Sequence, residues 1–368
     1  MEQNNAIHTP TAPNLQTELI DLSAPDAQQQ LARAAQCLRR GGLVAFPTET
    51  VYGLGANALD PDAARRVYAA KGRPADNPLI VHIAKTAQAA QFAYPTPLFE
   101  ELAARFWPGP LTMIVQKRAC IPDSVTGGLS TVGLRLPSEQ AARTLILQAG
   151  VPVAAPSANL SGKPSPTTAQ HVIRDLYGRV DMILCGPDAA VGVESTVIRL
   201  QEDETLTVLR PGAVTPQMLQ QAVGTNRVAL DQTVLQQANE TLRPQAPGMK
   251  YRHYAPRATV TLLRGTPAAQ RAALLEKRAQ PHTGILCYAE DEALLQGPLT
   301  MSLGPRDDVQ MQAHRLFACL RAFDDTDAVC IYAPLPQPQG IGLAVYNRLA
   351  KAAGFRIVPV QTANTPPS

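Results

Sequence analysis

The sequence predicts a two-domain α/β protein, in which short apolar strands and amphipathic helices form a mixed, twisted sheet followed by a smaller Rossmann-like domain. The chain has 368 residues, and single hydrophobic cores rarely grow beyond roughly 250 residues. Apolar residues make up 45% of the chain, enough for sizeable cores. Strands outnumber helices in the N-terminal part, whereas strands and helices alternate near the C-terminus, as in small parallel sheets.

The first elements are predicted by apolar spacing and by their end signals. Residues 26–40 have the spacing of an amphipathic helix that ends at a pair of glycines, and residues 43–46 form a short buried strand. Asp60-Pro61 starts the next helix, with Asp as the N-cap and Pro in the first turn. That helix is expected to end at Gly72.

The same signals define the rest of the first domain and the second domain. Further strands are predicted at 79–83, 111–116, 131–136, 151–155, 182–185, 196–200, 206–209, 258–264, 283–288, 328–333 and 356–360. Helices are predicted near 97–106, 139–149, 168–177, 267–278, 308–324 and 342–353. The expected organisation is a flexible N-terminus (1–18), a larger α/β domain (19–221), an interdomain linker (222–256), a C-terminal domain (257–361) and a flexible tail (362–368).

Composition and missing motifs argue against triad hydrolases, zinc enzymes and common kinases. The six cysteines form no C-x-x-C pair, the six histidines have no metal-ligand spacing, and no P-loop, G-x-S-x-G or H-E-x-x-H motif is present. The sequence therefore predicts no metal site built from side chains. Without a secretory signal or an apolar run of about 18 residues, we expect a cytoplasmic protein that does not enter a membrane.

Lys71-Gly72-Arg73-Pro74 carries two cations at a predicted helix end. Residues two apart do not share a helix face, but Gly72 ends the helix and Pro74 favours an extended Arg73. Both side chains can then turn toward one polyphosphate, Lys as a point charge and Arg as a fork. The alternative from spacing alone is a solvated helix end whose cations favour the C-terminal dipole.

Two loops rich in hydroxyl groups follow predicted strands. Residues 46–55 contain Thr48, Thr50 and two glycines, and residues 155–167 contain four serine or threonine hydroxyls and one amide. Both loops could bind a small ligand through hydroxyls and backbone N–H groups. Both could equally be ordinary turns.

Isolated polar residues lie in apolar strands. Arg135 must meet an anion or reach the surface, because an unpaired buried arginine is costly. A substrate carboxylate and a structural ion pair are both compatible with its position. His82, Arg210 and Glu194-Ser195 are ambiguous in the same way, and a hydrogen-bonded core histidine is the simpler interpretation of His82.

Seven segments, taken together and in order, resemble the YrdC/Sua5 family. They are FPTETVYGLGAN (46–57), KGRPADNPLIVHI (71–83), WPGPLT (107–112), TVGLRLP (131–137), PSAN (156–159), GVEST (192–196) and LRPG (209–212). The segment PGMKYRHYAP (247–256) and the second α/β domain resemble the long Sua5-type form rather than the single-domain form. The resemblance covers about residues 20–360.

The resemblance implies a YrdC-like twisted, largely parallel or mixed sheet and the reaction of a threonylcarbamoyl-AMP synthase. L-threonine, bicarbonate and ATP, with Mg²⁺, would give threonylcarbamoyl-AMP, pyrophosphate and water. Other proteins would transfer the threonylcarbamoyl group to adenosine 37 of tRNAs that read codons beginning with A, making t6A. Weak contact with tRNA is a further implication.

The family's functional residues map onto matching positions here. The resemblance assigns ATP to Lys71, Arg73, Thr131, Ser157, Asn159, Ser165 and Arg210, with Lys71 and Arg73 also as the catalytic pair. It assigns L-threonine to Thr48, His82, Arg135 and Ser195, with Arg135 on the carboxylate. Lys250, Tyr251 and Tyr254 of the linker would close over the site.

Two other classes of function remain as alternatives. A non-catalytic RNA-binding module could use a basic concave face, but the net charge is only +3 and aromatic residues make up 5%. A carbamoyl-transfer domain of the kind found in hydrogenase maturation enzymes is the third possibility. Those domains occur beside acylphosphatase and zinc-finger modules, which this sequence lacks.

Overall fold

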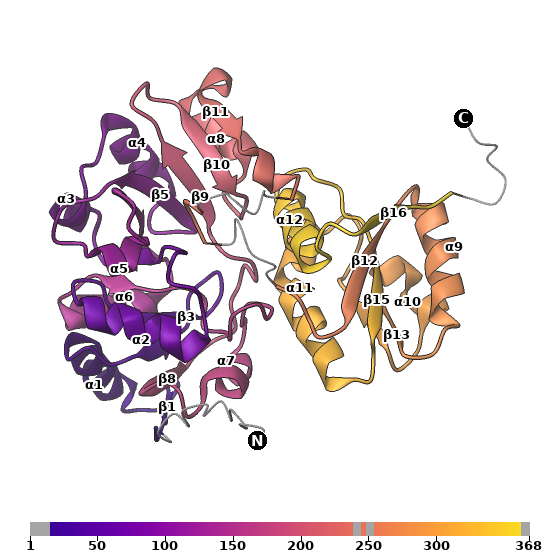
Figure 1. Cartoon of the computed structure of the whole chain (residues 1–368), viewed down its shortest axis with the longest axis horizontal. Helices are drawn as coiled ribbons and strands as arrows, with labels where there is room; N and C mark the ends of the chain where they lie inside the picture. The colour runs from indigo at the N-terminus through magenta and orange to yellow at the C-terminus, as the bar shows by residue number, and fades with distance from the viewer. Residues whose placement is uncertain (1–14, 238–243, 248–253, 362–368) are drawn as a thin grey trace, which may run out of the picture.

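A computed structural model describes residues 15–237, 244–247 and 254–361. The chain forms two α/β domains, with the larger N-terminal domain at the left of Figure 1 and the smaller C-terminal domain at the right. Helices α11 and α12 of the smaller domain face the larger one. No helix in the described ranges is long and apolar enough to cross a lipid bilayer.

The first domain is built on an eleven-stranded sheet. Its strands are β1 (Glu18–Asp21), β2 (Val44–Phe46), β3 (Gly53–Asn57), β4 (Ile80–His82), β5 (Leu111–Gln116), β6 (Thr131–Arg135), β7 (Val153–Ala154), β8 (Met182–Cys185), β9 (Thr196–Leu200), β10 (Leu206–Arg210) and β11 (Val228–Leu230). Its helices are α1 (Ala27–Arg39), α2 (Pro61–Lys71), α3 (Ala89–Phe92), α4 (Pro97–Phe106), α5 (Asp123–Thr126), α6 (Gln140–Ala149), α7 (Ala169–Leu176) and α8 (Pro216–Val223).

The large sheet is mixed. Its order is β1-β8-β2-β3-β7-β4-β6-β5-β9-β10-β11. Parallel pairs such as β4–β6 and β5–β9 occur beside antiparallel pairs such as β2–β3 and β7–β4. Strands β4, β6 and β10 consequently run opposite to β2 and β7.

Helices cover both faces of this sheet. Side chains of a strand alternate between faces, and in β2 the side chain of Ala45 joins one core cluster while Val44 and Phe46 join another. The first cluster includes apolar residues of α2, α4 and α7, and the second includes those of α1 and α6. The sheet is therefore the middle layer of the domain.

The second domain is a five-stranded parallel sheet in the order β14-β13-β15-β12-β16. Its strands are β12 (Thr259–Arg264), β13 (Thr283–Cys287), β14 (Thr300–Ser302), β15 (Cys330–Pro334) and β16 (Ile357–Pro359). Its helices are α9 (Pro267–Arg278), α10 (Ala289–Leu295), α11 (Val309–Ala322) and α12 (Gly342–Ala352). In Figure 1, α11 and α12 cover one side of the sheet and α9 and α10 the other, which is the predicted Rossmann-like arrangement.

Several elements were not expected from the sequence. Residues 46–55 were considered above as a ligand-binding loop or an ordinary turn, but residues 53–57 form the strand β3, which pairs with β2 and β7. The segment 222–256 is not only a linker, because β11 lies within it and extends the large sheet beside β10. The short elements β1, α3, α5, α8, α10 and β14 were also unforeseen.

Candidate functional site

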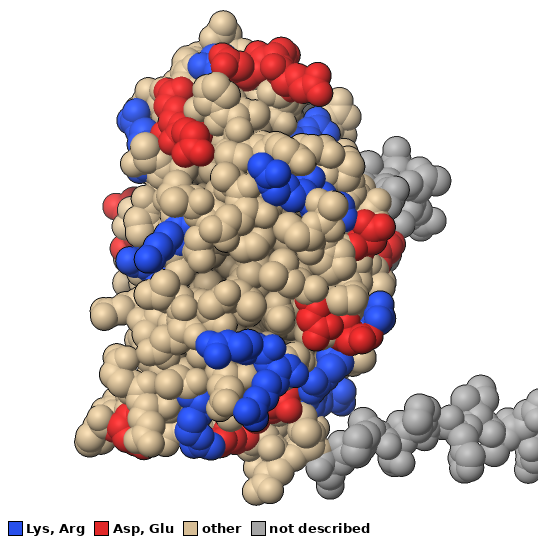
Figure 2. All heavy atoms as spheres, turned by 90° about the vertical axis from the view of Figure 1, so that its left-hand side faces the viewer, with Lys and Arg blue, Asp and Glu red and all other residues tan. Residues whose placement is uncertain are grey.

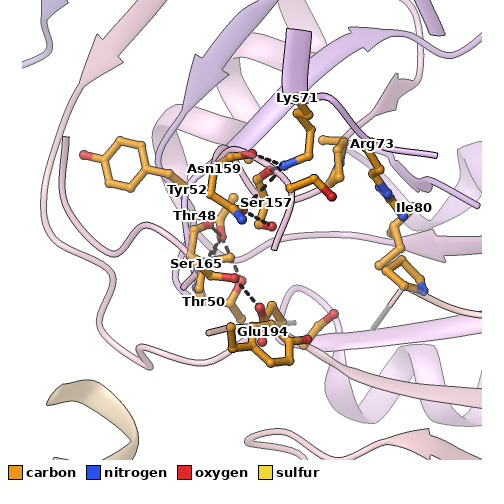
Figure 3. A pocket seen from close by; sticks show the side chains of 18 of the residues that line it. Thr48, Thr50, Tyr52, Lys71, Arg73, Ile80, Ser157, Asn159, Ser165 and Glu194 are labelled. Atoms are coloured by element: carbon orange, nitrogen blue, oxygen red, sulfur yellow. Dashed lines mark hydrogen bonds between the residues drawn. The ribbon is translucent and has the colours of Figure 1, made fainter. Parts of the chain in front are cut away.

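A pocket lies on the first domain where loops and strand ends from distant parts of the chain meet. It encloses about 720 Å³ of space, a figure that includes open solvent at its mouth. Most of the residues singled out above line it: Thr48, Lys71, Arg73, His82, Arg135, Ser157, Asn159, Ser165, Ser195, Arg210 and Tyr254. Figure 3 shows many of these side chains converging.

The end of α2 brings two cations to the pocket. Asp60 caps the helix start by accepting a hydrogen bond from the backbone N–H of Asp62, as predicted. Gly72 ends the helix in the left-handed conformation, with φ of 60°, which costs glycine little. The chain therefore turns between Lys71 and Arg73, and both side chains line the same pocket.

Lys71 is held by the loop that follows β7. Its Nζ donates hydrogen bonds to the backbone carbonyls of Ser157 and Asn159, and the Asn159 Oδ1 lies 3.4 Å away. Asn159 in turn donates from Nδ2 to the carbonyls of Leu160 and Lys163 at 2.8 and 2.9 Å. Burial, and then the charge of Arg73, hold the pKa of Lys71 well below its ordinary value.

Two arginines complete the cationic part of the pocket. Arg73 donates from Nη2 to the carbonyl of Pro78 at 3.1 Å, and burial lowers its pKa to about 10. Arg210, the last residue of β10, donates to the carbonyl and the hydroxyl of Ser195 at 3.0 and 3.1 Å. Among the described residues, no ion pair joins Lys71, Arg73 or Arg210 to a carboxylate, and Glu194, which lines the same pocket, already pairs with Arg348.

The opposite part of the pocket is neutral overall. Arg135 forms an ion pair with Glu49 at 2.8 Å and donates from Nη2 to the Thr50 hydroxyl at 2.9 Å. The structural ion pair considered above for Arg135 is therefore present, although Arg135 also lines the pocket. The Thr48 hydroxyl lies 2.9 Å from that of Thr50 and donates to the carbonyl of Val51 at 2.6 Å.

His82 is a neutral histidine on the pocket wall. Its Nδ1 lies 3.2 Å from the carbonyl of Ile80, and its ring packs edge-on against Phe46. Burial, followed by the positive charge of Arg135, lowers its pKa to about 3. His82 therefore carries no charge at neutral pH and can offer only hydrogen bonds.

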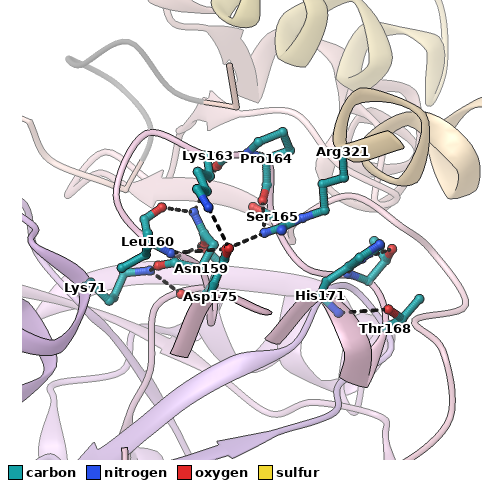
Figure 4. Close-up of polar contacts among 12 residues, drawn as sticks. Lys71, Asn159, Leu160, Lys163, Pro164, Ser165, Thr168, His171, Asp175 and Arg321 are labelled. Carbon is teal, nitrogen blue, oxygen red and sulfur yellow. Dashed lines mark hydrogen bonds and ion pairs between the residues drawn. The ribbon is translucent and has the colours of Figure 1, made fainter. Parts of the chain in front are cut away.

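The loop after β7 is held by an ion pair between its Lys163 and a buried carboxylate. Asp175 of α7 is 3.0 Å from the Lys163 Nζ and 2.7 Å from the Nη2 of Arg321, a residue of α11 in the second domain. Arg321 also donates to the carbonyl of Pro164 at 2.6 Å. Figure 4 shows these contacts around Asp175, which tie the pocket loop to the second domain.

Three predicted residues are not among those that line the described pocket. Thr131 lines a smaller hollow that shares only Ile80 and Pro247 with the main pocket. Thr131 is the first residue of the five-residue strand β6, and Arg135 is the last. Lys250 and Tyr251 lie outside the described residues.

Tyr254, the described residue of the predicted lid, lies on the pocket wall. It is 5% exposed, and its ring packs on Phe317 of α11 with centroids 5.3 Å apart. The last part of the linker therefore contacts the second domain and the pocket together.

Sequence reasoning did not select several residues that line the pocket, among them Glu194, Lys163 and Tyr52. Glu194 accepts a hydrogen bond from Ser165 at Oε1. The available signal was its position directly before Ser195 and β9, which left its role ambiguous. Tyr52 donates from its hydroxyl to the carbonyl of Gly186 at 2.8 Å, and no local pattern distinguishes it from a core tyrosine.

The surface and the side-chain chemistry restrict other functions. Figure 2 shows the face of the first domain turned away from the second, where basic and acidic groups are interspersed with wide uncharged areas. This visible face lacks the continuous basic stripe typical of nucleic-acid binding. Within the parts of the chain that the structure describes, no three His, Cys, Asp or Glu residues are grouped so that they could hold a metal ion.

Comparison with known proteins identifies the family. The Sua5/YciO/YrdC model, described as telomere recombination, matches residues 36–212. The model described as threonylcarbamoyl-AMP synthase, C-terminal domain, matches residues 214–354.

Full-length relatives agree with both matches. Threonylcarbamoyl-AMP synthase of Pyrococcus abyssi is 43% identical over 94% of this chain and 100% of its own length. The Bacillus subtilis protein of the same name is 43% identical over 92% of this chain and 96% of its own. The crystal structure of P. abyssi Sua5 complexed with L-threonine superimposes with a TM-score of 0.85 at 42% identity, covering 94% of this chain and 99% of that one. This chain therefore belongs to the Sua5 family of threonylcarbamoyl-AMP synthases, in its two-domain form.

Proposed function

We propose that this protein makes L-threonylcarbamoyl-AMP from L-threonine, bicarbonate and ATP, with release of pyrophosphate. The observation that carries the proposal is one pocket with two chemically different parts. One part holds Lys71, Arg73 and Arg210, none of which forms an ion pair among the described residues, and the other holds Arg135, Thr48 and His82. A triphosphate suits the first part and a small amino acid the second.

The cationic part favours ATP phosphates. Buried cations without an ion-pair partner are costly, and an anionic ligand would supply such a partner. Arg73 and Arg210 can each present a fork of donors to phosphate oxygens, while Lys71 acts as a point charge. Hydroxyls of Ser157 and Ser165 and the amide of Asn159 line the same wall and would hold ribose or phosphate oxygens.

The other part favours L-threonine, which the P. abyssi Sua5 structure contains. Arg135 would share its guanidinium between Glu49 and the threonine carboxylate, because a guanidinium has five N–H donors. Thr48, neutral His82 and Ser195 would provide hydrogen bonds to the remaining polar groups. Ser195 is held by Arg210 and by Thr112, so it links the two parts of the pocket.

The reaction needs no protein nucleophile. The threonine amine and bicarbonate would form a carbamate with loss of water, and a carbamate oxygen would attack the α-phosphorus of ATP. The bond from that phosphorus to the bridging oxygen would break, and pyrophosphate would leave with the electron pair. Catalysis would come from positioning and from stabilising the charge of pyrophosphate by Lys71 and Arg73.

Mg²⁺ would arrive with ATP and share the phosphate charge. In proteins Mg²⁺ often keeps several waters and is bound largely through substrate phosphates. Glu194, the acidic residue that lines the pocket, already pairs with Arg348 and accepts a bond from Ser165. The ligands of the ion would therefore be phosphate oxygens and water.

Later steps follow from the product. A mixed anhydride of AMP is an activated acyl donor, so a separate transferase would pass the threonylcarbamoyl group to adenosine 37 of tRNAs that read codons beginning with A. These steps would take place in the cytoplasm, with tRNA contact here at most weak.

An omission experiment tests the proposal. Pyrophosphate release from ATP should require both L-threonine and bicarbonate, and Lys71→Met should lower ATP affinity about 10- to 100-fold, as expected for loss of a charged hydrogen bond. Lys85→Met, an exposed lysine, is the matched control. Equal pyrophosphate release without threonine would rule out the proposed reaction.

A further inference from the structure

A fully buried arginine of the second domain reaches the wall of the pocket. Arg348 lies on α12 and has no exposed surface, and it is the largest fully buried side chain among the described residues. Few arginines are buried so completely unless they are paired. Its partners therefore indicate what it does.

Apart from Asn347 of its own helix, to which Nη1 donates at 3.1 Å, those partners belong to the first domain and the linker end. Arg348 donates from Nε to the Glu194 Oε2 at 2.8 Å and from Nη1 to the carbonyl of Pro211 at 2.9 Å. A weaker bond of 3.4 Å joins Nη2 to the carbonyl of Glu194. Its guanidinium also lies 5.6 Å from the ring centroid of Tyr254, so Arg348 contacts three separate segments around the pocket.

Glu194 connects this arginine to the cationic part of the pocket. Its carboxylate lines the pocket, is 6% exposed, and accepts a hydrogen bond from Ser165. Lys71 and Arg210 lie close enough for their charges to interact with it. A carboxylate at this position would oppose a bound triphosphate if its charge were not balanced.

We propose that Arg348 is a positioning residue for the nucleotide site, through which the second domain balances the charge of Glu194 and fixes Glu194 against Ser165. The inference rests on the proposed ATP-dependent function. Arg348 does not itself line the pocket, so it acts through Glu194. The second domain thereby helps to form a site that lies on the first.

The experiment compares full-length variants by calorimetric titration of ATP and of L-threonine. Arg348→Gln keeps a hydrogen-bond donor but removes the charge, and we expect it to weaken ATP binding about tenfold or more. Arg348→Lys keeps the charge but not the fork of donors, so it should lose clearly less ATP affinity than Arg348→Gln. Arg348→Gln combined with Glu194→Gln should recover most of the affinity, because no unbalanced carboxylate remains.

The matched control is Arg271→Met. Arg271 pairs with buried Asp291 inside the second domain, far from the pocket-lining set, and Asp291 keeps Arg306 as a partner. This variant should bind ATP like the original protein. Thermal unfolding of each variant reports whether it is folded.

Three outcomes would overturn the inference. Arg348→Gln could bind ATP unchanged, the double variant could bind as weakly as the single one, or folded Arg348→Lys could lose affinity as strongly as Arg348→Gln. The second outcome would show a merely structural role. Failure of the original protein to bind ATP would instead reject the proposed function.

Discussion

Arg135, which lines the pocket, forms a buried ion pair with Glu49. Because of this pair, substitutions can distinguish the role of Arg135 in threonine binding from its role in stability. The carboxylate of Glu49 is 9% exposed and lies 2.8 Å from Arg135. Breaking a buried ion pair by removing one partner leaves the other charge without compensation. A single substitution here therefore changes both folding and binding, whereas a double substitution can separate them.

We expect Arg135→Met to lower the free energy of unfolding by about 3–5 kcal/mol. Arg135→Met combined with Glu49→Gln should recover much of this loss, since the unpaired charge is gone. Threonine binding should remain lost in both variants. Urea unfolding and threonine titration measure the two quantities, and normal threonine affinity in the double variant would exclude Arg135 as the carboxylate ligand.

His82 makes stability depend on pH. Its pKa is about 3 in the folded protein, lowered by burial and by Arg135, and is ordinarily near 6.5. Between these values the unfolded chain binds more protons, so stability is full above pH 6.5 and falls as the pH drops toward 3. The slope from one such group is at most ~1.4 kcal/mol per pH unit.

His82→Gln should reduce that slope without abolishing it. His171, whose pKa burial lowers to about 4, contributes in the same direction and remains in the variant. Urea unfolding at several pH values between 4 and 7 gives the slope. An unchanged slope would mean that His82 is protonated in the folded protein.

At the scale of secondary structure, the end of α2 decides where the two cations point. Gly72 has φ of 60°, and a Cβ added there would meet nothing within 4 Å. The cost of another residue at this position is therefore conformational. Gly150, which ends α6 with φ of 66°, has the same geometry and does not line the pocket.

Gly72→Ala and Gly150→Ala should each lower the free energy of unfolding by about 1–2 kcal/mol, the cost of left-handed backbone for a residue with a Cβ. Only Gly72→Ala should weaken ATP binding, because the turn it strains carries Arg73. Denaturant unfolding and ATP titration compare the two. Equal ATP affinities would show that the turn does not set the position of Arg73.

The sequence predicted those elements whose signals are local. The limits of α2 follow from Asp60, Pro61 and Gly72, which act within one helical turn. The strand β3 was misinterpreted because Gly53 and Gly55 are typical of turns. In the structure, a Cβ on Gly55 would lie 2.8 Å from both Phe46 and Val153, so close packing requires this glycine.

The candidate site was predictable where a family motif covers it. Arg348 lies 154 residues along the chain from its partner Glu194. Arg321 lies 146 residues along the chain from its partner Asp175. No local pattern connects residues at such distances. Thr131 was assigned to the ATP site by the motif alone. In the structure it is the first residue of β6 and lines the smaller hollow.

At the scale of the whole molecule, buried ion pairs join the two domains. Arg321 and Asp175 are both almost fully buried, whereas Arg174 and Asp325 form a second interdomain pair that is about half exposed. Burial decides how much each pair contributes, because solvent screens exposed pairs. The two pairs form a natural comparison.

Arg321→Met should lower the free energy of unfolding by about 3–5 kcal/mol, since among the described residues it leaves Asp175 one ion-pair partner, the partly exposed Lys163. Arg174→Met should change it by at most ~1 kcal/mol. Denaturant unfolding of the full chain measures both. Similar small effects would mean that the domains are held together by apolar contacts rather than by this pair.

In the proposed reaction, one pocket joins the carbon of bicarbonate, the amine of threonine and the α-phosphate of ATP. Carbon-labelled bicarbonate supplied with threonine and ATP tests it directly, with the products separated and weighed by mass spectrometry. We expect one labelled product that contains both AMP and threonine and is absent when any substrate is omitted. An AMP adduct of threonine without the labelled carbon would contradict the account.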